Sequence, residues 1–251
     1  MPQIDFSAHR LFVDAPLESG AEVALNRSQS HYLGTVLRLG PNDAILTFNG
    51  RDGEWRATLI GGKSSSSLRL EVQTRPQPSS PALHYCFAPL KHSRLDYMVQ
   101  KAVEMGASVL QPVSTRRTQA TRVNEVRMRA NAIEAAEQCG VLALADVRAP
   151  LRFADLLDRW PNDRPMVFCD EAAEVTDPVE ALRRVGPRAE RGVGLIIGPE
   201  GGFDPDERRA LMALPHTVRL SLGPRVLRAD TAAVAALAVI QAVLGDWHAP
   251  E

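Results

Sequence analysis

The hydrophobic and polar positions of this chain follow two different patterns, and the change falls near residue 75. Before it, short segments alternate polar and apolar residues with the period of two that marks strands with one buried face. Such strands are predicted at 44–48, 54–60 and 67–72. Asn49-Gly50 supplies a turn signal after the first of them, and residues 30–38 are expected to form a short helix or turn. Short strands with close turns predict a small β-barrel or sandwich.

From residue 82, apolar runs alternate with stretches in which apolar residues recur at helical spacing. This alternation predicts the α/β class, with a mostly parallel sheet covered by helices on both faces. Strands are predicted at 83–88, 108–113, 166–169, 193–197 and 217–221. Helices are predicted at 94–105, 122–139, 153–159, 177–185, 205–213 and 231–244.

Two of these helices carry boundary signals. Ser93 and Asp96 have the spacing of an N-terminal cap before helix 94–105, and Gly106 follows the end of that helix. Asp204 is placed to cap helix 205–213, with Pro205 at its first position and Glu207 at its third. The first helix also carries an apolar stripe that predicts a buried face, formed by Leu95, Met98, Val99, Ala102 and Val103.

The two patterns meet at residues 74–81, which contain three prolines and are predicted to form a stiff linker. We therefore expect one domain at 1–74 and a second at 82–251. Ser64–Ser67 is a low-complexity stretch and is expected to form a loop.

Composition narrows the class of protein. The chain has 251 residues, 45% of them hydrophobic, so it can bury a full core. Its cysteines, Cys86, Cys139 and Cys169, are far apart and lack metal-ligand spacing, which argues against a disulfide framework and a zinc site. Residues 1–5 lack the features of a secretory signal, and the longest apolar run, 232–240, is too short to span a membrane. We expect a cytoplasmic protein without a metal.

The net charge of −1 hides a local excess of positive charge. Residues 91–129 contain eight Lys or Arg and three Asp or Glu, a balance of 8 − 3 = +5. Arg116 and Arg117 lie in this segment directly after a predicted strand. A basic stripe is the usual footprint of a protein that binds phosphate backbones, although a solvated helix face would give the same composition.

Two loops that follow predicted strands carry the strongest candidate chemistry. One is Gly198-Pro199-Glu200-Gly201-Gly202 after Ile197, and the other is 222–228 after the strand that contains Leu220. The carboxyl ends of parallel strands share one edge of a sheet, so the loops predict one shared small-molecule site. The loop at 198–202 has the pattern of neither a Walker nor a dinucleotide motif. Apolar walls and the exposed backbone of Gly223 would suit an adenine ring.

The same stretches resemble the ribosomal RNA small subunit methyltransferase E family, the 16S rRNA uridine-N3 methyltransferases of the knotted SPOUT superfamily. The resemblance rests on GPEGG at 198–202 and LGPRVLR at 222–228, and it covers nearly the whole chain. Further matching residues are His31-Tyr32-Leu33, Val36-Leu37-Arg38-Leu39, Lys91, Gln100-Lys101-Ala102, Glu104-Met105-Gly106, Glu134 to Gly140 and Thr231-Ala232-Ala233.

The resemblance implies a fold and a reaction. Residues 1–74 would form a PUA-like RNA-binding β domain, and 82–251 a SPOUT domain with a trefoil knot around 193–244, a feature nearly absent from other proteins. The protein would be a homodimer that uses S-adenosylmethionine to form m3U1498 in 16S rRNA of the small ribosomal subunit. The residues expected to hold this cofactor are Cys169, Ile197, Gly198, Pro199, Glu200, Gly201, Gly202, Leu220, Leu222, Gly223, Val226, Leu227, Arg228 and Thr231.

The chain departs from the family pattern at several positions. Val141 and Arg116 stand where the family usually has Arg and often has Glu, respectively. Ala229-Asp230-Thr231 replaces the usual Thr-Glu-Thr, so Asp230 keeps the charge with a shorter side chain. These departures leave the two cofactor loops intact.

Uridine N3 carries a proton, so the reaction needs a base or a cation that stabilises the developing uridine anion. Arg228 directly follows the cofactor loop and is the expected cation. Asp230 or Glu200 would orient it or accept the proton, although Asp230 could equally cap the last helix. The expected RNA contacts are Arg10, Arg38, Lys91, Arg116 and Arg117.

Three other functions stay open at this point. The chain could be a SPOUT enzyme that methylates the ribose 2′-hydroxyl of ribosomal or transfer RNA. It could be an RNA-binding assembly factor without turnover, an alternative that Val141 and Ala229 support. An unrelated nucleotide-binding α/β enzyme is disfavoured because the phosphate motifs are missing.

Overall fold

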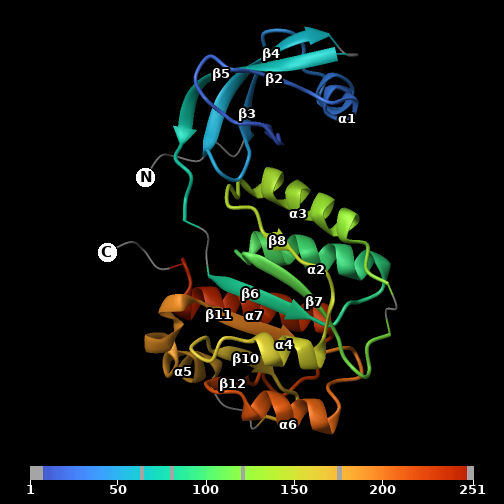
Figure 1. The fold of residues 1–251 in the computed structure, drawn as a ribbon, viewed down its shortest axis with the longest axis vertical. Helices are drawn as coiled ribbons and strands as arrows, with labels where there is room; N and C mark the ends of the chain where they lie inside the picture. The colour runs from blue at the N-terminus through green and yellow to red at the C-terminus, as the bar shows by residue number, and fades with distance from the viewer. Residues whose placement is uncertain (1–7, 63–64, 80–81, 120–121, 174–176, 248–251) are drawn as a thin grey trace. The chain divides into compact units, whose positions relative to one another are not determined.

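The structure is a computed structural model that describes residues 8–62, 65–79, 82–119, 122–173 and 177–247. The sequence interpretations of residues 1–5 and Ser64 lie outside these ranges. The chain divides into two compact units, and each is described by itself (Figure 1). The first contains Met1–Ser79 and Ile133–Leu144, and the second contains Ser80–Ala132 and Ala145–Glu251. This grouping differs from the predicted domains in the segment 133–144, and it divides the predicted linker between the two units.

The first unit is built on a curled sheet with strand order β1-β3-β4-β5-β2. The strands are β1 (Arg10–Phe12), β2 (Glu22–Ala24), β3 (Ala44–Phe48), β4 (Glu54–Gly62) and β5 (Ser65–Arg75). A short helix, α1 (Arg27–His31), continues into one π-helical turn, Tyr32–Val36. The predicted strands are confirmed. The loop predicted at Ser64–Ser67 is wrong for its described residues, since Ser66 and Ser67 pair with Gly61 and Ile60 of β4.

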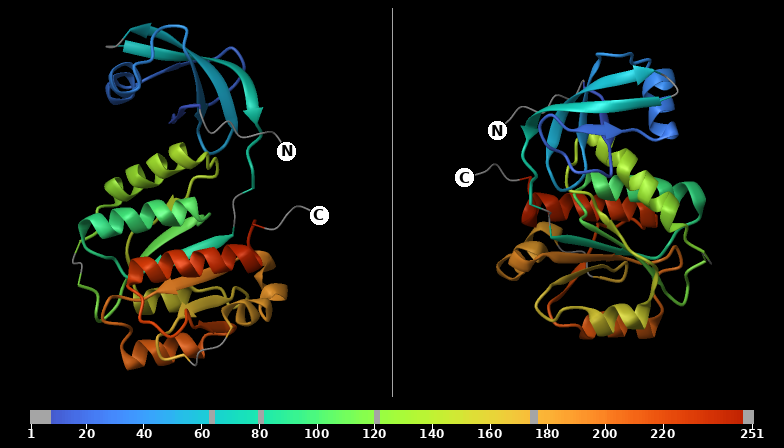
Figure 2. Two further views of the ribbon diagram at one scale, coloured as in Figure 1. Left: turned by 180° about the vertical axis from the view of Figure 1, so that it is seen from behind. Right: turned by 45° about the horizontal axis from the view of Figure 1, so that its top comes forward.

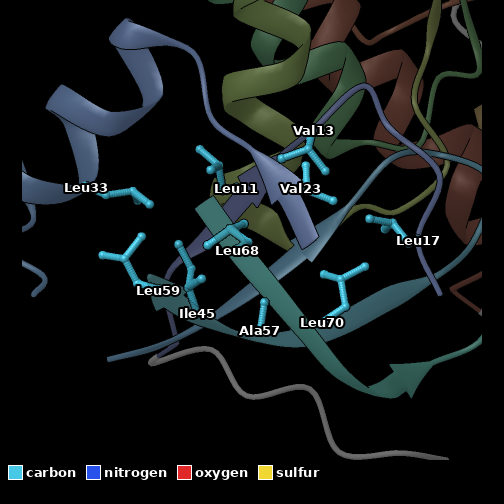
Figure 3. Packing of buried hydrophobic residues seen from close by; sticks show 10 residues of the cluster. All are labelled: Leu11, Val13, Leu17, Val23, Leu33, Ile45, Ala57, Leu59, Leu68 and Leu70. Atoms are coloured by element: carbon cyan, nitrogen blue, oxygen red, sulfur yellow. The ribbon is translucent and has the colours of Figure 1, made fainter. Parts of the chain in front are cut away.

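The core of this unit follows from alternation along neighbouring strands. Ala57 and Leu59 of β4 face the same side as their partners Leu70 and Leu68 of β5. Figure 3 shows these side chains gathered with Leu33 and with apolar residues of the other strands. All of them are buried, and each fully buried aliphatic side chain contributes about 1.5–3 kcal/mol relative to exposure.

A buried ion cluster lies in the same unit. Arg10 is only 5% exposed, and its Nε donates to Glu54 at 2.9 Å. Arg75 donates to Glu54 at 2.6 Å and to the carbonyl of Gly140 at 3.0 Å, while the backbone N–H of Phe12 donates to Glu137. These bonds hold segment 133–144 within the unit. The guanidinium of Arg10 is therefore buried against a carboxylate, and an RNA contact by this residue stays a prediction.

The second unit contains a sheet whose seven strands, counted over the described residues, all pair in parallel. The order is β12-β10-β11-β6-β7-β8, and β9 pairs separately with β7. The strands are β6 (Leu83–Phe87), β7 (Val109–Ser114), β8 (Asp146–Val147), β9 (Leu151–Arg152), β10 (Met166–Cys169), β11 (Val193–Ile197) and β12 (Thr217–Leu220). The predicted α/β class with a mostly parallel sheet is confirmed.

Helices cover both faces of this sheet, as predicted. They are α2 (His92–Glu104), α4 (Phe153–Arg159), α5 (Pro178–Arg183), α6 (Pro205–Ala213) and α7 (Ala229–Leu244), with a 3-10 turn at Gly186–Arg191, while α3 (Glu125–Cys139) begins in this unit and ends in segment 133–144 of the first. In Figure 1, α4 lies on the viewer's side of the sheet. In the left view of Figure 2, seen from behind, α7 lies on the viewer's side. The predicted apolar stripe of α2 is buried.

The helix boundaries follow the sequence signals in part. Asp204 caps α6 through a capping box with Glu207, as predicted. The predicted Ser93 cap is wrong: Lys91 occupies the cap position of α2 without a side-chain bond. Asp96 binds Arg127 instead, at 2.6 Å. Within the described residues, every helix falls short of the length and apolarity that a membrane crossing requires. The knot around 193–244 stays a prediction.

Candidate functional site

A cavity of about 410 Å³ lies where β10, β11 and β12 end. These strands are neighbours in the sheet and run in parallel, so the loops that follow them meet at one edge. The cavity is lined by segments 168–173, 197–203 and 220–229, except Gly201, and by Arg208 and Ala232. Its volume lies in the range of small-molecule sites, about 300–1,000 Å³.

Most of the residues predicted to hold a cofactor line this cavity. Gly201 and Thr231 do not. Gly201 instead accepts a hydrogen bond from Arg117 through its carbonyl, at 2.7 Å. The predicted residues that the structure brings together are Cys169, Ile197, Gly198, Pro199, Glu200, Gly202, Leu220, Leu222, Gly223, Val226, Leu227 and Arg228.

Two glycines shape the cavity for different reasons. A Cβ on Gly198 would lie 2.8 Å from the ring of Phe203, and this ring packs edge-on against Phe168. The missing side chain of Gly198 therefore makes room for an aromatic cluster inside the unit. Gly223 has a φ of +94° with open space around its Cβ position, so its backbone conformation requires glycine.

The loop after β10 is fixed by Asp170, a residue that the sequence interpretation missed. Its side chain is 3% exposed and binds Arg208 and Arg219, each at 2.8 Å. Burial alone would raise the pKa of Asp170, but hydrogen bonds from the two guanidinium groups outweigh it and hold the pKa below its usual value. The sequence did contain a signal that Asp170 belongs to the site, because this residue directly follows a predicted strand that ends at this edge of the sheet.

Arg94 of α2 is a second residue that the sequence interpretation did not place in the site. Its Nε donates to Asp230 at 2.9 Å, and its Nη1 donates to Glu200. The third nitrogen, Nη2, is buried without a hydrogen-bond partner among the described residues. One guanidinium thus connects the loop after β11 with the first turn of α7.

This contact changes the roles open to the two carboxylates. The hydrogen bond from Arg94 lowers the pKa of Asp230, which makes that carboxylate a weaker proton acceptor near neutral pH. Asp230 is not the cap of α7, because Arg228 occupies the cap position. Arg228 itself is exposed at the edge of the cavity and makes no side-chain capping bond.

Two protein-family models match this chain. Residues 77–241 match the RNA methyltransferase domain, and residues 25–72 match the RNA methyltransferase PUA domain. The ribosomal RNA small subunit methyltransferase E of Rickettsia conorii is 31% identical over 235 residues, 93% of this chain and 95% of the relative. The chain belongs to the ribosomal RNA small subunit methyltransferase E family. The relative from Synechocystis is 30% identical over 94% of this chain and 78% of its own length.

Solved structures of related proteins are similar to the fold described above. The ribosomal RNA small subunit methyltransferase E of Neisseria gonorrhoeae, bound to S-adenosyl methionine, has a TM-score of 0.83 and 25% identity, with 96% of this chain and all of that chain covered. A Legionella pneumophila protein solved with bound SAM has a TM-score of 0.80 and 26% identity, over 95% and 99% of the two chains. The predicted family and fold class are confirmed.

The residues predicted to contact RNA differ in whether they are already paired with carboxylates. Arg116 pairs with Asp204 at 2.9 Å and with Asp206 at 3.0 Å, so part of the predicted basic stripe is neutralised by acids outside it. Arg117 and Lys91 are exposed in the second unit, and Arg38 is exposed in the first. Within the described ranges, no group of His, Cys, Asp and Glu could hold a metal ion.

Proposed function

We propose that this protein methylates N3 of one uridine in 16S rRNA, at the position of m3U1498, with S-adenosylmethionine as methyl donor. The observation that carries the proposal is the cavity formed by three loops at the ends of β10, β11 and β12. It lies in a chain of the ribosomal RNA small subunit methyltransferase E family, whose N. gonorrhoeae member was solved with this cofactor.

The residues of the cavity fit the cofactor. Ile197, Leu220 and Leu222 supply apolar walls for an adenine ring, and backbone groups beside Gly198 and Gly223 supply hydrogen-bond partners. Glu200 also lines the cavity, with its carboxylate bound by Arg94. When bound, S-adenosylmethionine supplies an electrophilic methyl group on a sulfonium. The chain's own residues must then orient the uridine and stabilise the charge that develops on it.

We assign that charge stabilisation to Arg228. Its exposed side chain at the cavity edge can donate to a uridine carbonyl oxygen as the N3 proton leaves. Arg94 holds Asp230 and Glu200, so both act as positioning groups that fix the loop after β11 against the start of α7. Orientation of this kind can itself lower the barrier by several kcal/mol, about 7–11 in the best intramolecular cases.

We further propose that RNA contacts Arg38 in the PUA-like unit and Lys91, Arg116 and Arg117 near the cavity. Exposed guanidinium and ammonium groups bind phosphates without reading sequence. Arg116 would exchange its surface carboxylates for phosphate, since exposed ion pairs are worth only about 0–1 kcal/mol. A homodimer that presents both copies of these residues to one RNA belongs to the same proposal.

The decisive experiment uses labelled S-adenosylmethionine and small ribosomal subunits from a strain that lacks this methylation. Reverse transcription should stop at one new position in 16S rRNA, because a methyl group on N3 blocks base pairing. Arg228→Ala should lower single-turnover methylation by about 10²–10³-fold, while Arg184→Ala, which replaces an exposed arginine directly after α5, should not. Label without a stop would instead indicate ribose 2′-O-methylation and would refute the proposal.

A further inference from the structure

A second cavity lies in the same unit, on the face of the sheet that α4 covers. Its volume is about 530 Å³, and it is formed by β6, β7, the segment after β8, α4 and the turn before β10. It shares no residue with the cavity at the ends of β10, β11 and β12. Three arginines line it, Arg148, Arg159 and Arg164, together with His84 and Gln111. Among the residues that the structure describes, its lining contains no carboxylate.

The floor of this cavity is closely packed. Alternation along β6 places His84 and Cys86 on the same face of the sheet. The ring of Trp160 lies edge-on to His84, with centroids 6.0 Å apart, and a Cβ on Gly194 of β11 would lie 2.3 Å from the Trp160 ring. The indole therefore fills the space over a glycine of the sheet.

Arg164 is held against this floor by groups that carry no negative charge. Its guanidinium lies 5.7 Å from the centroid of the Trp160 ring, and the Trp160 indole N–H donates to the Arg164 carbonyl at 2.9 Å. Its Nη1 lies 3.2 Å from Nδ1 of His84. Its Nε is buried and has no hydrogen-bond partner in the described structure.

His84 supplies no negative charge that would balance the guanidinium of Arg164. A guanidinium has only donors, so Nδ1 of His84 must accept from Arg164, which requires that nitrogen to be unprotonated. Burial first, and then the charges of Arg164 and Arg148, lower the pKa of His84 to about 4, so the ring is neutral at physiological pH. Two carboxylates lie in the surroundings: Asp146 pairs with Arg148 at 2.8 Å through half-exposed side chains, and Asp163, which pairs with Arg191, has its pKa lowered in part by the charge of Arg164.

Other arginines of this unit have a different environment. Arg94 and Arg208, which are also partly buried, each bind a carboxylate. Arg164 has an imidazole and an unpartnered Nε instead. A guanidinium held away from water without a counter-charge is costly, and a bound anion with several acceptor oxygens would offset that cost.

We propose that this cavity is a phosphate-binding site, in which Arg164, Arg159 and Arg148 bind the oxygens of one phosphate group of a nucleotide or of RNA. Planar guanidinium groups match phosphate oxygens in pairs. The cavity is large enough for a nucleotide around the phosphate. The site is separate from the methyl-transfer cavity and holds whether or not the proposed reaction is right.

Titration calorimetry of the purified full chain with pyrophosphate tests the site. We expect saturable binding that weakens by roughly tenfold or more in Arg164→Gln, which removes the charge-assisted hydrogen bonds. Arg159→Gln, at an exposed position of α4, should also weaken binding, and it keeps the test valid if Arg164→Gln fails to fold. Arg184→Gln, which removes an exposed, ion-paired arginine directly after α5, is the matched control. Binding of S-adenosylmethionine should be equal in all four proteins and reports their folding.

A single-stranded RNA oligonucleotide then identifies the source of the phosphate. If the site binds the RNA backbone, Arg159→Gln weakens RNA binding, lowers its salt dependence and removes competition by pyrophosphate. If the site binds a free nucleotide, RNA binding is unchanged while pyrophosphate binding still weakens. Either result supports the site. Absence of pyrophosphate binding at millimolar concentration, or equal binding by Arg164→Gln, Arg159→Gln and Arg184→Gln, overturns it.

Discussion

At the scale of single residues, the contact that matters most for the chemistry is made by Arg94. Sequence reasoning offers Asp230 and Glu200 as groups that accept a proton or orient Arg228. The structure joins both to one guanidinium, and the lowered pKa of Asp230 disfavours it as a base. The proton on N3 of the uridine would then pass to water, and Arg228 would stabilise the anion that forms.

Replacing Arg94 should therefore slow the chemical step more than it weakens cofactor binding. Arg94→Met releases Glu200 and Asp230, and a displacement of this kind costs on the order of 10²-fold in rate. Single-turnover methylation of small subunits measures the rate, and calorimetry measures S-adenosylmethionine affinity. Arg127→Met removes another ion-paired arginine, bound to Asp96, and should keep normal activity. Full activity of Arg94→Met would contradict the positioning role.

Asp170 gives a second test at this scale. Asp170→Asn keeps the shape but leaves Arg208 and Arg219 with a neutral partner, so we expect a loss of about 1–3 kcal/mol in the free energy of unfolding. Urea denaturation measures it. Asp163→Asn, which removes an exposed ion pair with Arg191, should cost no more than about 1 kcal/mol. Equal losses in the two variants would show that Asp170 does not anchor its loop.

At the scale of elements, packing of Phe203 against Gly198 helps to set the shape of the loop after β11. Gly198→Ala would bring a methyl group 2.8 Å from the Phe203 ring, and overpacking of this kind costs about 1–3 kcal/mol. Thermal unfolding of the full chain checks this, with Gly62→Ala as the control because its Cβ position is open. An unchanged transition in Gly198→Ala would mean that Phe203 moves freely.

The elements also show how far the sequence alone can predict this structure. Strands β10 and β11 have the predicted boundaries, because a strand buried on both faces appears in the sequence as an uninterrupted apolar run. β8 and β9 have two residues each and leave no periodic signal. The loops of the cavity were predictable from strand ends. Arg94 was not, since it meets Asp230 from 136 residues away and only the folded chain brings them together.

At the scale of the whole molecule, the first unit depends on a buried charge cluster. Glu54→Gln removes the carboxylate that Arg10 and Arg75 both bind, and breaking a buried pair in this way costs about 3–5 kcal/mol. Burial alone would raise the pKa of Glu54, but hydrogen bonds from Arg75, Thr74 and Arg10 lower it below its usual value.

The pH dependence of this loss has a definite sign. A carboxylate whose pKa is lower in the folded state adds stability above its unfolded pKa, about 4.3, and loses it as the pH falls. The difference in unfolding free energy between wild type and Glu54→Gln should therefore be largest at neutral pH and shrink below about pH 5. Urea denaturation across this range measures it. A constant difference down to pH 3 would contradict the ionised pairing.

The bonds of segment 133–144 within the first unit have a practical consequence for anyone who wishes to study the PUA-like part alone. A chain that stops at Ser79 would lack Gly140, which accepts from Arg75, and Glu137, which accepts from the backbone of Phe12. Such a fragment would be one continuous stretch of sequence, but it would lack part of the folded unit. A usable fragment would instead join residues 8–79 to a grafted copy of 133–144. The first unit can therefore be isolated only by connecting two separate segments of the chain, and a single truncation does not give it.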